Sequence, residues 1–555
     1  MPNILNQLIL LYGSSAEDVH HKVTRFISEH QPAVPKRWVT EDDIVLITYG
    51  DSIKNKDEKP LHTLNTFLNA YVKQKINIIH LLPMFPYTSD DGFSVTDYRS
   101  INPDLGTWAH IKNLSTHYDL MFDAVINHIS VSSRWFQGFL QGDEAYADYF
   151  IECDDTLDYS AVTRPRALPL YYPYKTKTGR KNIWATFSED QVDLNFKNPK
   201  VLLEILDILV LYANKGARLI RLDAIGFIWK KLGTACMHLA ETHALIQIIR
   251  AVIEACVPGT ILISETNVPH KENISYLGNG FDEAHMVYQF PLPPLTLFSF
   301  LVGRATKLTR WAKSLEDTPL SPKTAYFNFL ASHDGIGLRP VDDILNDKEK
   351  EIIRANVLTN GGRISYKNNQ DGSQTPYELN INYQDAIYIR GDSDETRIRK
   401  FLAAQSILLT VIGVPGIYVH SLLGSRNDDE GVKSTNIPRR INREKLQYDT
   451  LVSELEAGSD RTIIFSGFLK MIDLRKSQSA FSPAAEQKVL AMDERLFAYI
   501  RKNNRTNESI LVITNVSSEV VLINIGDRTV DIITGRCHEG ELRIEPFQYL
   551  WLKIQ

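Results

Sequence analysis

Charged side chains stand directly after several apolar stretches of this 555-residue chain. In RLDAIGF (221–227), Arg221 and Asp223 are two positions apart, so an extended backbone would direct both side chains to one face. Other polar residues in the same relation to an apolar stretch are Asp90, His128, Glu265, His333 and Asp334. Each alone is more often a helix cap, a turn residue or a satisfied core group. Their recurrence in equivalent positions indicates one shared site.

Carboxylates are the catalytic groups that this sequence offers. It contains no GxSxG, GxxxxGK[ST] or GxGxxG motif, and its four cysteines lack CxxC spacing (Cys153, Cys236, Cys256 and Cys537). Two carboxylates in a polar, aromatic-rich pocket can transfer a glycosyl group, because one attacks the anomeric carbon while the other protonates the leaving oxygen. Glycosyl transfer is therefore the chemistry that the residues favour, and we expect neither a metal ion nor a cofactor.

Eight short runs rich in β-branched residues are predicted to be the strands that position these groups: 43–50, 76–83, 119–128, 216–225, 259–266, 284–290, 324–332 and 413–421. Segments with helical spacing lie between several of them, such as 201–216, which ends on a capping glycine. Strands that alternate with helices predict an α/β fold with a parallel sheet, and eight units match a closed (β/α)8 TIM barrel. An open, doubly wound sheet is the alternative. In a barrel, the polar groups would meet at one mouth.

The pattern divides the chain into three parts. Residues 1–40 are predicted to form a helical extension, and residues 41–478 the barrel. Two insertions interrupt the barrel, an inserted domain at 129–197 and a lid-like insertion at 335–398, and connections of this length are usually functional. Short alternating runs between polar turns predict a C-terminal antiparallel β-sandwich over 479–555.

The overall composition is that of an ordinary globular protein. Hydrophobic residues make up 43% of the chain, and the net charge of −6 gives no general attraction to nucleic acid or to an anionic membrane. No apolar run approaches the roughly 18 residues of a membrane span. We therefore expect small-molecule substrates and a cytoplasmic location. The sequence indicates no oligomeric state.

Four short motifs give the polar residues a more specific meaning: DAVINH (123–128), RLDAIGF (221–227), ISET (263–266) and FLASHD (329–334). In this order they resemble the four signature regions of the α-amylase superfamily (glycoside hydrolase family 13), a resemblance that extends over about residues 40–555. It implies that Asp223 is a nucleophile and Glu265 a general acid/base. It also implies that Asp334 is a third carboxylate, which fixes the sugar hydroxyl groups.

The same resemblance implies roles for the neighbouring basic residues. Arg221 would keep Asp223 ionised. His128 and His333 would hydrogen-bond the hydroxyl groups of a glucosyl unit. The superfamily also shares the predicted barrel, the excursion after its third strand and the C-terminal sandwich.

Further segments resemble the sucrose phosphorylase-like branch of this superfamily: LLPMFPYTSDDGFSVTDY (81–98), RPRALP (164–169) and INR (441–443). The resemblance implies that Asp90 and Arg443 clamp the far end of a single glucosyl unit. Phe93 and Phe227 match aromatic positions beside that pocket. The branch is not known to need the calcium ion of true amylases.

Within the branch, IWKKLGT, ETNVPHKENISY, YELNINY and LLGSRND resemble glucosylglycerate and glucosylglycerol phosphorylases more than sucrose phosphorylase. Glu378 stands where the sucrose enzyme has an acceptor-site glutamine, and Phe227 where it has a tyrosine. Arg164 and Arg166 match a loop implicated in phosphate or acceptor binding, although a salt-bridged surface loop is an equal alternative.

The resemblance thus implies a retaining α-glucoside phosphorylase, acting on 2-O-α-D-glucosylglycerate and phosphate through a covalent glucosyl-enzyme. Glucosylglycerol, sucrose and sucrose 6-phosphate are alternative substrates. A hydrolase or transglucosidase on the same barrel is a second reading, because the four motifs do not specify the acceptor. A catalytically inactive sugar-binding barrel is a third, which the presence of all three carboxylates disfavours.

Overall fold

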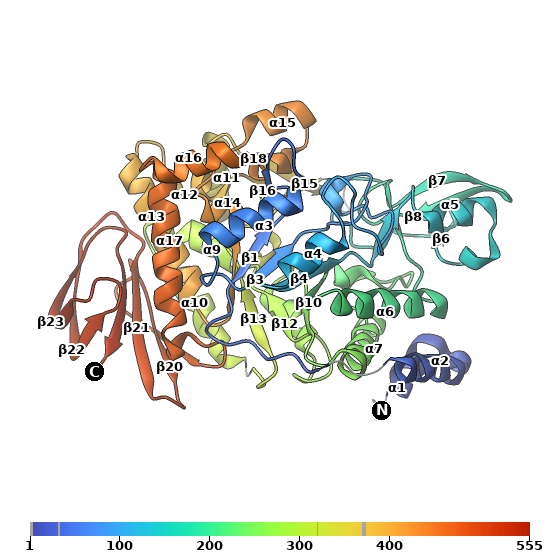
Figure 1. The fold of residues 1–555 in the computed structure, drawn as a ribbon, viewed down its shortest axis with the longest axis horizontal. Coiled ribbons are helices and arrows are strands. Elements are labelled where there is room, and N and C mark those ends of the chain that lie inside the picture. Colours follow the sequence, from blue (N-terminus) through green and yellow to red (C-terminus); the bar gives the residue numbers. More distant parts are fainter. Residues whose placement is uncertain (1–3, 31–33, 319, 369–372) are drawn as a thin grey trace.

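The computed structural model describes residues 4–30, 34–318, 320–368 and 373–555 (Figure 1). Residues 1–3 and 31–33 of the predicted extension, and 369–372 of the second predicted insertion, lie outside this description. At its centre, eight parallel strands close into a barrel: β1 (Val45–Thr48), β3 (Ile78–Leu81), β4 (Asp119–Ala124), β10 (Ala217–Leu222), β11 (Ile261–Ser264), β12 (Met286–Tyr288), β13 (Ala325–Asn328) and β17 (Val414–Tyr418). Each lies within one predicted segment. The barrel is therefore confirmed, and the open sheet is wrong.

Helices follow the barrel strands along the chain: α3 (Pro60–Tyr71), α4 (Trp108–Leu114), α6 (Pro199–Asn214), α7 (Ala240–Cys256), α8 (His270–Asn273), α9 (Leu292–Val302), α10 (Thr306–Ser314), α11 (Asp347–Thr359), α12 (Tyr383–Ile387), α13 (Asp394–Thr410), α14 (Val419–Leu422), α15 (Asp429–Thr435), α16 (Tyr448–Glu456) and α17 (Asp460–Lys476). In α6, Pro199 occupies the first turn, and the Asn198 side chain accepts the Lys200 N–H. Strands such as β1 and β11 are buried along their whole length, as expected for a sheet packed on both faces.

Two excursions follow the carboxyl ends of β4 and β13. The first contains β5 (His128–Ser130) paired with β9 (Gln191–Asp193), helix α5 (Arg134–Gln141) and the sheet of β6 (Glu152–Cys153), β8 (Gly179–Trp184) and β7 (Tyr171–Thr176). The second contains a sheet of β14 (Ile336–Gly337), β16 (Gln374–Asn380) and β15 (Arg363–Asn368). Because both start at the barrel mouth, each can contribute side chains to a site there.

The two ends of the chain pack on the outside of the barrel (Figure 1). Helices α1 (Leu5–Tyr12) and α2 (Ala16–Glu29) lie against α7. The C-terminal antiparallel sheet has the order β19 (Glu486–Leu490), β20 (Leu496–Asn503), β21 (Glu508–Asn515), β24 (Tyr549–Ile554), β22 (Val521–Asp531), β23 (Cys537–Ile544). Trp551 donates from Nε1 to Ser406 Oγ of α13 at 2.8 Å, which fixes one sheet face to the barrel helices. Leu511 and Ile513 belong to a separate small core on the other face.

In the described part of the chain, no helix is long and apolar enough to cross a membrane.

A buried ion network ties the first barrel strand to its neighbours at the end opposite the excursions. Asp43, fully buried just before β1, accepts hydrogen bonds from Arg218 at 2.9 Å and from Arg37 at 2.7 and 2.8 Å. Asn77 and the Thr40 N–H also donate to its carboxylate. Several donors are needed to replace the lost hydration of a buried carboxylate. Asp43 therefore joins the segment before β1 to the starts of β3 and β10.

We predict that Asp43→Asn lowers the free energy of unfolding by about 3 kcal/mol, because the buried Arg218 then keeps only the partly exposed Asp119 as a counter-charge. Urea denaturation followed by circular dichroism measures this loss. Asp42→Asn, at the exposed neighbouring position, is the matched control and should change stability by less than about 0.5 kcal/mol. Equal effects of the two substitutions would contradict a structural role for the network.

Candidate active site

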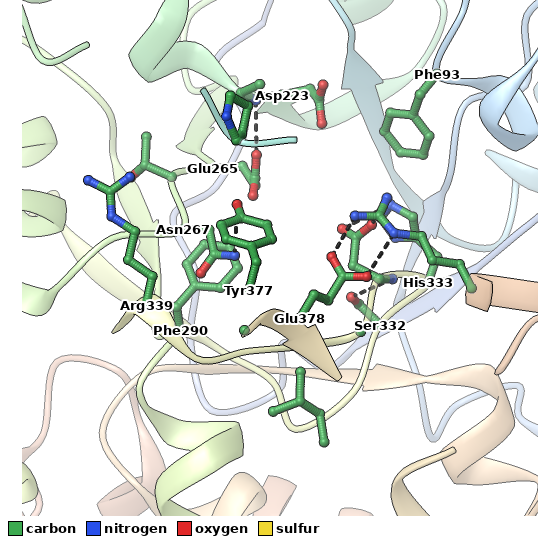
Figure 2. Close-up of a pocket in the computed structure, with 18 of the residues that line it drawn as sticks. Phe93, Asp223, Glu265, Asn267, Phe290, Ser332, His333, Arg339, Tyr377 and Glu378 are labelled. Carbon is green, nitrogen blue, oxygen red and sulfur yellow. Dashed lines mark hydrogen bonds and ion pairs between the residues drawn. The ribbon is translucent and has the colours of Figure 1, made fainter. Parts of the chain in front are cut away.

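Asp223 and Glu265 lie side by side at the mouth of the barrel. Each is the residue immediately after its strand, and the register pairs Leu222 of β10 with Ser264 of β11. The Glu265 N–H continues the ladder by donating to the Leu222 carbonyl at 3.1 Å. The two carboxylates thus occupy equivalent positions on adjacent strands and line one pocket (Figure 2).

Arg221 is the cation shared by the carboxylates of this site. Its Nη1 donates to Asp223 Oδ1 at 2.8 Å, whereas Nη2 lies 3.7 Å from Glu265 Oε2. It also pairs with Asp123, which stands opposite it on β4. Asp123 in turn bonds His80 Nε2 at 2.7 Å. Asp123 and His80 therefore fix the position of Arg221 on its buried side, and its positive charge faces the pocket.

The two central carboxyl groups cannot both carry a full charge. Burial raises the pKa of Asp223 and of Glu265, and neighbouring negative charge adds to both shifts, from Glu265 on Asp223 and from Asp334 on Glu265. The pair therefore retains one proton near neutral pH. Because Arg221 bonds Asp223 directly and stands farther from Glu265, the negative charge belongs on Asp223 and the proton on Glu265.

Ala224 fixes the orientation of Glu265 through an unusual backbone conformation. Its φ of 47° and ψ of 31° are left-handed, a region that side chains other than glycine rarely adopt. In this conformation its N–H donates to Glu265 Oε2 at 2.9 Å. The strained backbone at Ala224 thus allows its N–H to contact the Glu265 carboxylate.

Aromatic and imidazole rings form one wall of the pocket. The Phe93 ring stacks on His333 with centroids 4.8 Å apart and an interplanar angle of 4°. His128 bonds the Phe93 carbonyl through Nε2 at 2.9 Å. Burial lowers the pKa of His128, and it lowers that of His333 to about 3, so both rings are neutral. Phe227 meets Phe187 edge to face at 5.6 Å and completes an apolar edge.

Asp334 is held by Arg439, a residue that we did not identify from the sequence. Arg439 Nη1 lies 2.7 Å from Asp334 Oδ1, and the same guanidinium grips both oxygens of Glu378 at 2.8 and 2.6 Å. Burial opposes ionisation of Asp334, but Arg439, His333 and Arg443 hold its pKa below the ordinary value. Arg439 therefore connects the loop after β13 to Glu378 on β16 of the second excursion.

Asp90 and Arg443, expected to act together, have different partners in the structure. Arg443 is fully buried and bonds Asp91 Oδ2 at 2.7 Å and the His333 carbonyl at 2.7 Å. Asp90 instead accepts a hydrogen bond from Arg166 at 2.9 Å. The adjacent Asp91, a residue that we had not selected, is thus the direct partner of Arg443.

Of the two arginines in the RPRALP loop, only Arg166 is among the described residues that line the pocket. Arg166 lines the pocket, where it bonds Asp90 and lies over the Phe187 ring at 5.6 Å. Arg164 is not among the described residues that line this pocket. The described residues include no group of three or more His, Cys, Asp or Glu placed to hold a metal ion.

Several further side chains line the pocket without having been predicted: Gln191, Asn267, Phe290, Arg339, Tyr377 and Arg439. Asn267 Nδ2 donates to the Tyr377 hydroxyl at 3.3 Å, close to Glu265 (Figure 2). Tyr377 precedes Glu378 in YELN, so the motif that marked Glu378 could have indicated it. Asn267 follows Glu265 in ETNVPHKENISY, and Phe290 ends the predicted strand 284–290, so both had a signal; Gln191, Arg339 and Arg439 lie outside the motifs and predicted strands.

Comparison with known proteins gives concordant matches. The family description "Alpha amylase, catalytic domain" matches residues 68–366. The glucosylglycerate phosphorylase of Spirochaeta thermophila is 49% identical over 476 residues, covering 86% of this chain and 80% of its own length. The enzyme of the same name from Allomeiothermus silvanus is 44% identical over 555 residues and covers 99% of this chain and 98% of its own length.

Among solved structures, the sucrose 6F-phosphate phosphorylase from Thermoanaerobacter thermosaccharolyticum superimposes with a TM-score of 0.75. It is 24% identical in sequence and covers 92% of this chain and 99% of its own. At this identity the match concerns the fold.

The shared Arg439 predicts a measurable coupling between Arg439 and Glu378. Arg439→Gln should lower the free energy of unfolding by about 3 kcal/mol, because it leaves Asp334 and the buried Glu378 without their shared counter-ion. Glu378→Gln in the Arg439→Gln background should recover about 2 kcal/mol. Urea denaturation of the wild type, the two single variants and the double variant measures this coupling energy as a double-mutant cycle.

Lys433→Gln, which breaks an exposed ion pair on α15, is the control and should be nearly neutral. Strictly additive effects of the Arg439 and Glu378 substitutions would show that the bidentate contact carries no coupling.

Proposed function

The chain belongs to the alpha-amylase family, as its four motifs predicted, and we propose that it is a retaining glucosylglycerate phosphorylase. The reaction is the reversible conversion of 2-O-α-D-glucosylglycerate and phosphate into α-D-glucose 1-phosphate and D-glycerate. The observation that carries the choice of substrate is the 49% and 44% identity to two proteins of that name, over most of each chain. The chemical support is the Asp223–Glu265 pair, with one charge and one proton.

In the first half-reaction, an Asp223 oxygen attacks the anomeric carbon of the glucosyl unit. The bond from that carbon to the glycerate oxygen breaks, and Glu265 gives its proton to the leaving oxygen. Arg221 holds Asp223 as the carboxylate, so that its electron pair is available. The products of this step are free glycerate and a β-linked glucosyl-enzyme.

In the second half-reaction, a phosphate oxygen attacks the same carbon from the vacated side. The bond to Asp223 breaks, and Glu265, now the carboxylate, takes the phosphate proton. Two inversions leave the α-configuration unchanged. Both the proton and the charge return to their starting positions, so the pair is ready for another turnover.

The remaining residues bind the glucosyl unit in this proposal. Asp334, kept ionised by Arg439, accepts hydrogen bonds from sugar hydroxyl groups. His333 lines the pocket as a neutral ring beside Asp334, which places it to hydrogen-bond a sugar hydroxyl group. The stacked Phe93 ring supplies an apolar surface beside it.

The proposal extends to a cytoplasmic location, as expected from the sequence. Cys153, Cys236, Cys256 and Cys537 are free, as is usual in a reducing compartment.

Incubation with glucosylglycerate and inorganic phosphate should release glucose 1-phosphate, detected by a coupled dehydrogenase assay. Asp223→Asn should reduce the rate by at least about 10⁴-fold, since the amide cannot form the covalent intermediate. Sucrose, sucrose 6-phosphate and glucosylglycerol serve as comparison substrates. Free glucose released equally fast without phosphate would identify a hydrolase instead, and no turnover of any glucoside would favour a binding protein.

The role of Glu265 can be tested through pH. Its pKa is raised above the ordinary value of about 4.3, so kcat/KM for glucosylglycerate should fall as pH rises through that pKa and the acid is lost. With α-glucosyl fluoride, whose leaving group needs no proton, this alkaline limb should disappear from kcat/KM.

Glu265→Gln should correspondingly reduce kcat/KM about 10²- to 10⁴-fold for glucosylglycerate but less than about tenfold for the fluoride. Equal losses for both donors would assign Glu265 a role other than proton donation.

A further inference from the structure

Arg339 lines the pocket near Glu265 and takes no part in either proposed half-reaction. It begins the short helical turn η7 (Arg339–Val341), directly after β14 of the second excursion. Figure 2 shows it on the side of the pocket that Asn267 and Tyr377 occupy, across from Glu378 and His333. The proton donor Glu265 lies on this side too, and the leaving oxygen must therefore depart toward it.

The guanidinium of Arg339 is available to a ligand. Its polar contacts in the described chain are Met237 Sδ at 3.7 Å and Glu272 Oε2 at 3.6 Å, neither a short hydrogen bond to oxygen. Glu272 is 44% exposed, so water weakens its attraction for Arg339. Arginine carries five N–H donors in a planar fork that matches a carboxylate or a phosphate. Among the described residues, most of the Arg339 donors have no hydrogen-bond acceptor.

The other arginines that line the pocket are already committed. Arg166 bonds Asp90, Arg221 bonds Asp123 and Asp223, and Arg439 bonds Asp334 and Glu378. Each of these arginines shares its charge with a carboxylate at short distance, which weakens its attraction for an incoming anion. Arg339 can bind it without that loss.

The charge balance of the pocket points to the same residue. With Glu265 protonated, four carboxylates among the lining residues face four arginines. The other three arginines contact all four of these carboxylates and are outnumbered by them, so Arg339 brings the lining to neutrality. Without it the pocket would be net negative and would repel an anion.

We propose that Arg339 is the specificity residue for anionic acceptors, and that it binds the carboxylate of glycerate in one half-reaction and phosphate in the next. Asn267 and the Tyr377 hydroxyl border the same space and can contribute further hydrogen bonds. One cation then serves both anions in turn, since glycerate leaves before phosphate enters. This inference rests on the proposed phosphorylase function.

The test uses α-glucosyl fluoride as a neutral donor and measures transfer to D-glycerate, inorganic phosphate and glycerol separately. Glycerol lacks the carboxylate and reports on the pocket without the anion. Arg339→Gln should lower the ratio of kcat/KM for glycerate over glycerol by about 10- to 100-fold, and likewise the ratio for phosphate over glycerol. Arg339→Lys keeps the charge but not the planar fork. Both of its kcat/KM ratios should therefore lie between those of the wild type and those of Arg339→Gln.

Arg310→Gln, at an exposed position on α10, is the matched control and should leave both ratios unchanged. A loss confined to one anion assigns the site to that anion. If Arg339→Gln transfers glucose to glycerol and both ratios stay at the wild-type value, Arg339 is not an anion site. A wild-type enzyme that transfers to neither glycerate nor phosphate would instead overturn the proposed function itself.

Discussion

The site depends on one guanidinium placed among three carboxylates. Arg221 contacts Asp123 on one side and Asp223 on the other, and lies within 4 Å of Glu265. Carboxylates at this depth would otherwise neutralise one another by taking up protons. The unequal distances to Asp223 and Glu265 divide the pair into a charged and a protonated member. The register of β4, β10 and β11 sets these distances, so the electrostatics of the site follow from barrel closure.

Much of this arrangement could be predicted from the sequence, because it depends on strands. Apolar β-branched runs marked all eight barrel strands, and the polar residues after them had to meet at one mouth. The partners of Asp90 and Arg443 could not be predicted in this way. Both residues lie outside the barrel strands, where partners come from segments distant in sequence rather than from a repeating register. Arg439 was missed for the same reason, since no strand or motif precedes it.

The two ends of the barrel have different roles, since one end holds a network that stabilises the fold and the opposite mouth holds the catalytic groups. At the starts of the strands, Asp43 is surrounded by donors that fully satisfy it. At the opposite mouth, His333 keeps a buried nitrogen without a partner in the described chain, and Ala224 keeps a strained backbone. The strained backbone of Ala224 thus stands beside the catalytic pair, where its N–H orients Glu265.

The bidentate grip of Arg439 on Glu378 has an evolutionary consequence. Glu378 on β16 shares its counter-ion with Asp334 in the loop after β13. A change at position 378 alone redistributes the charge around Asp334, so the two positions are electrostatically coupled. We therefore expect substitutions at position 378 to be epistatic with substitutions at position 439.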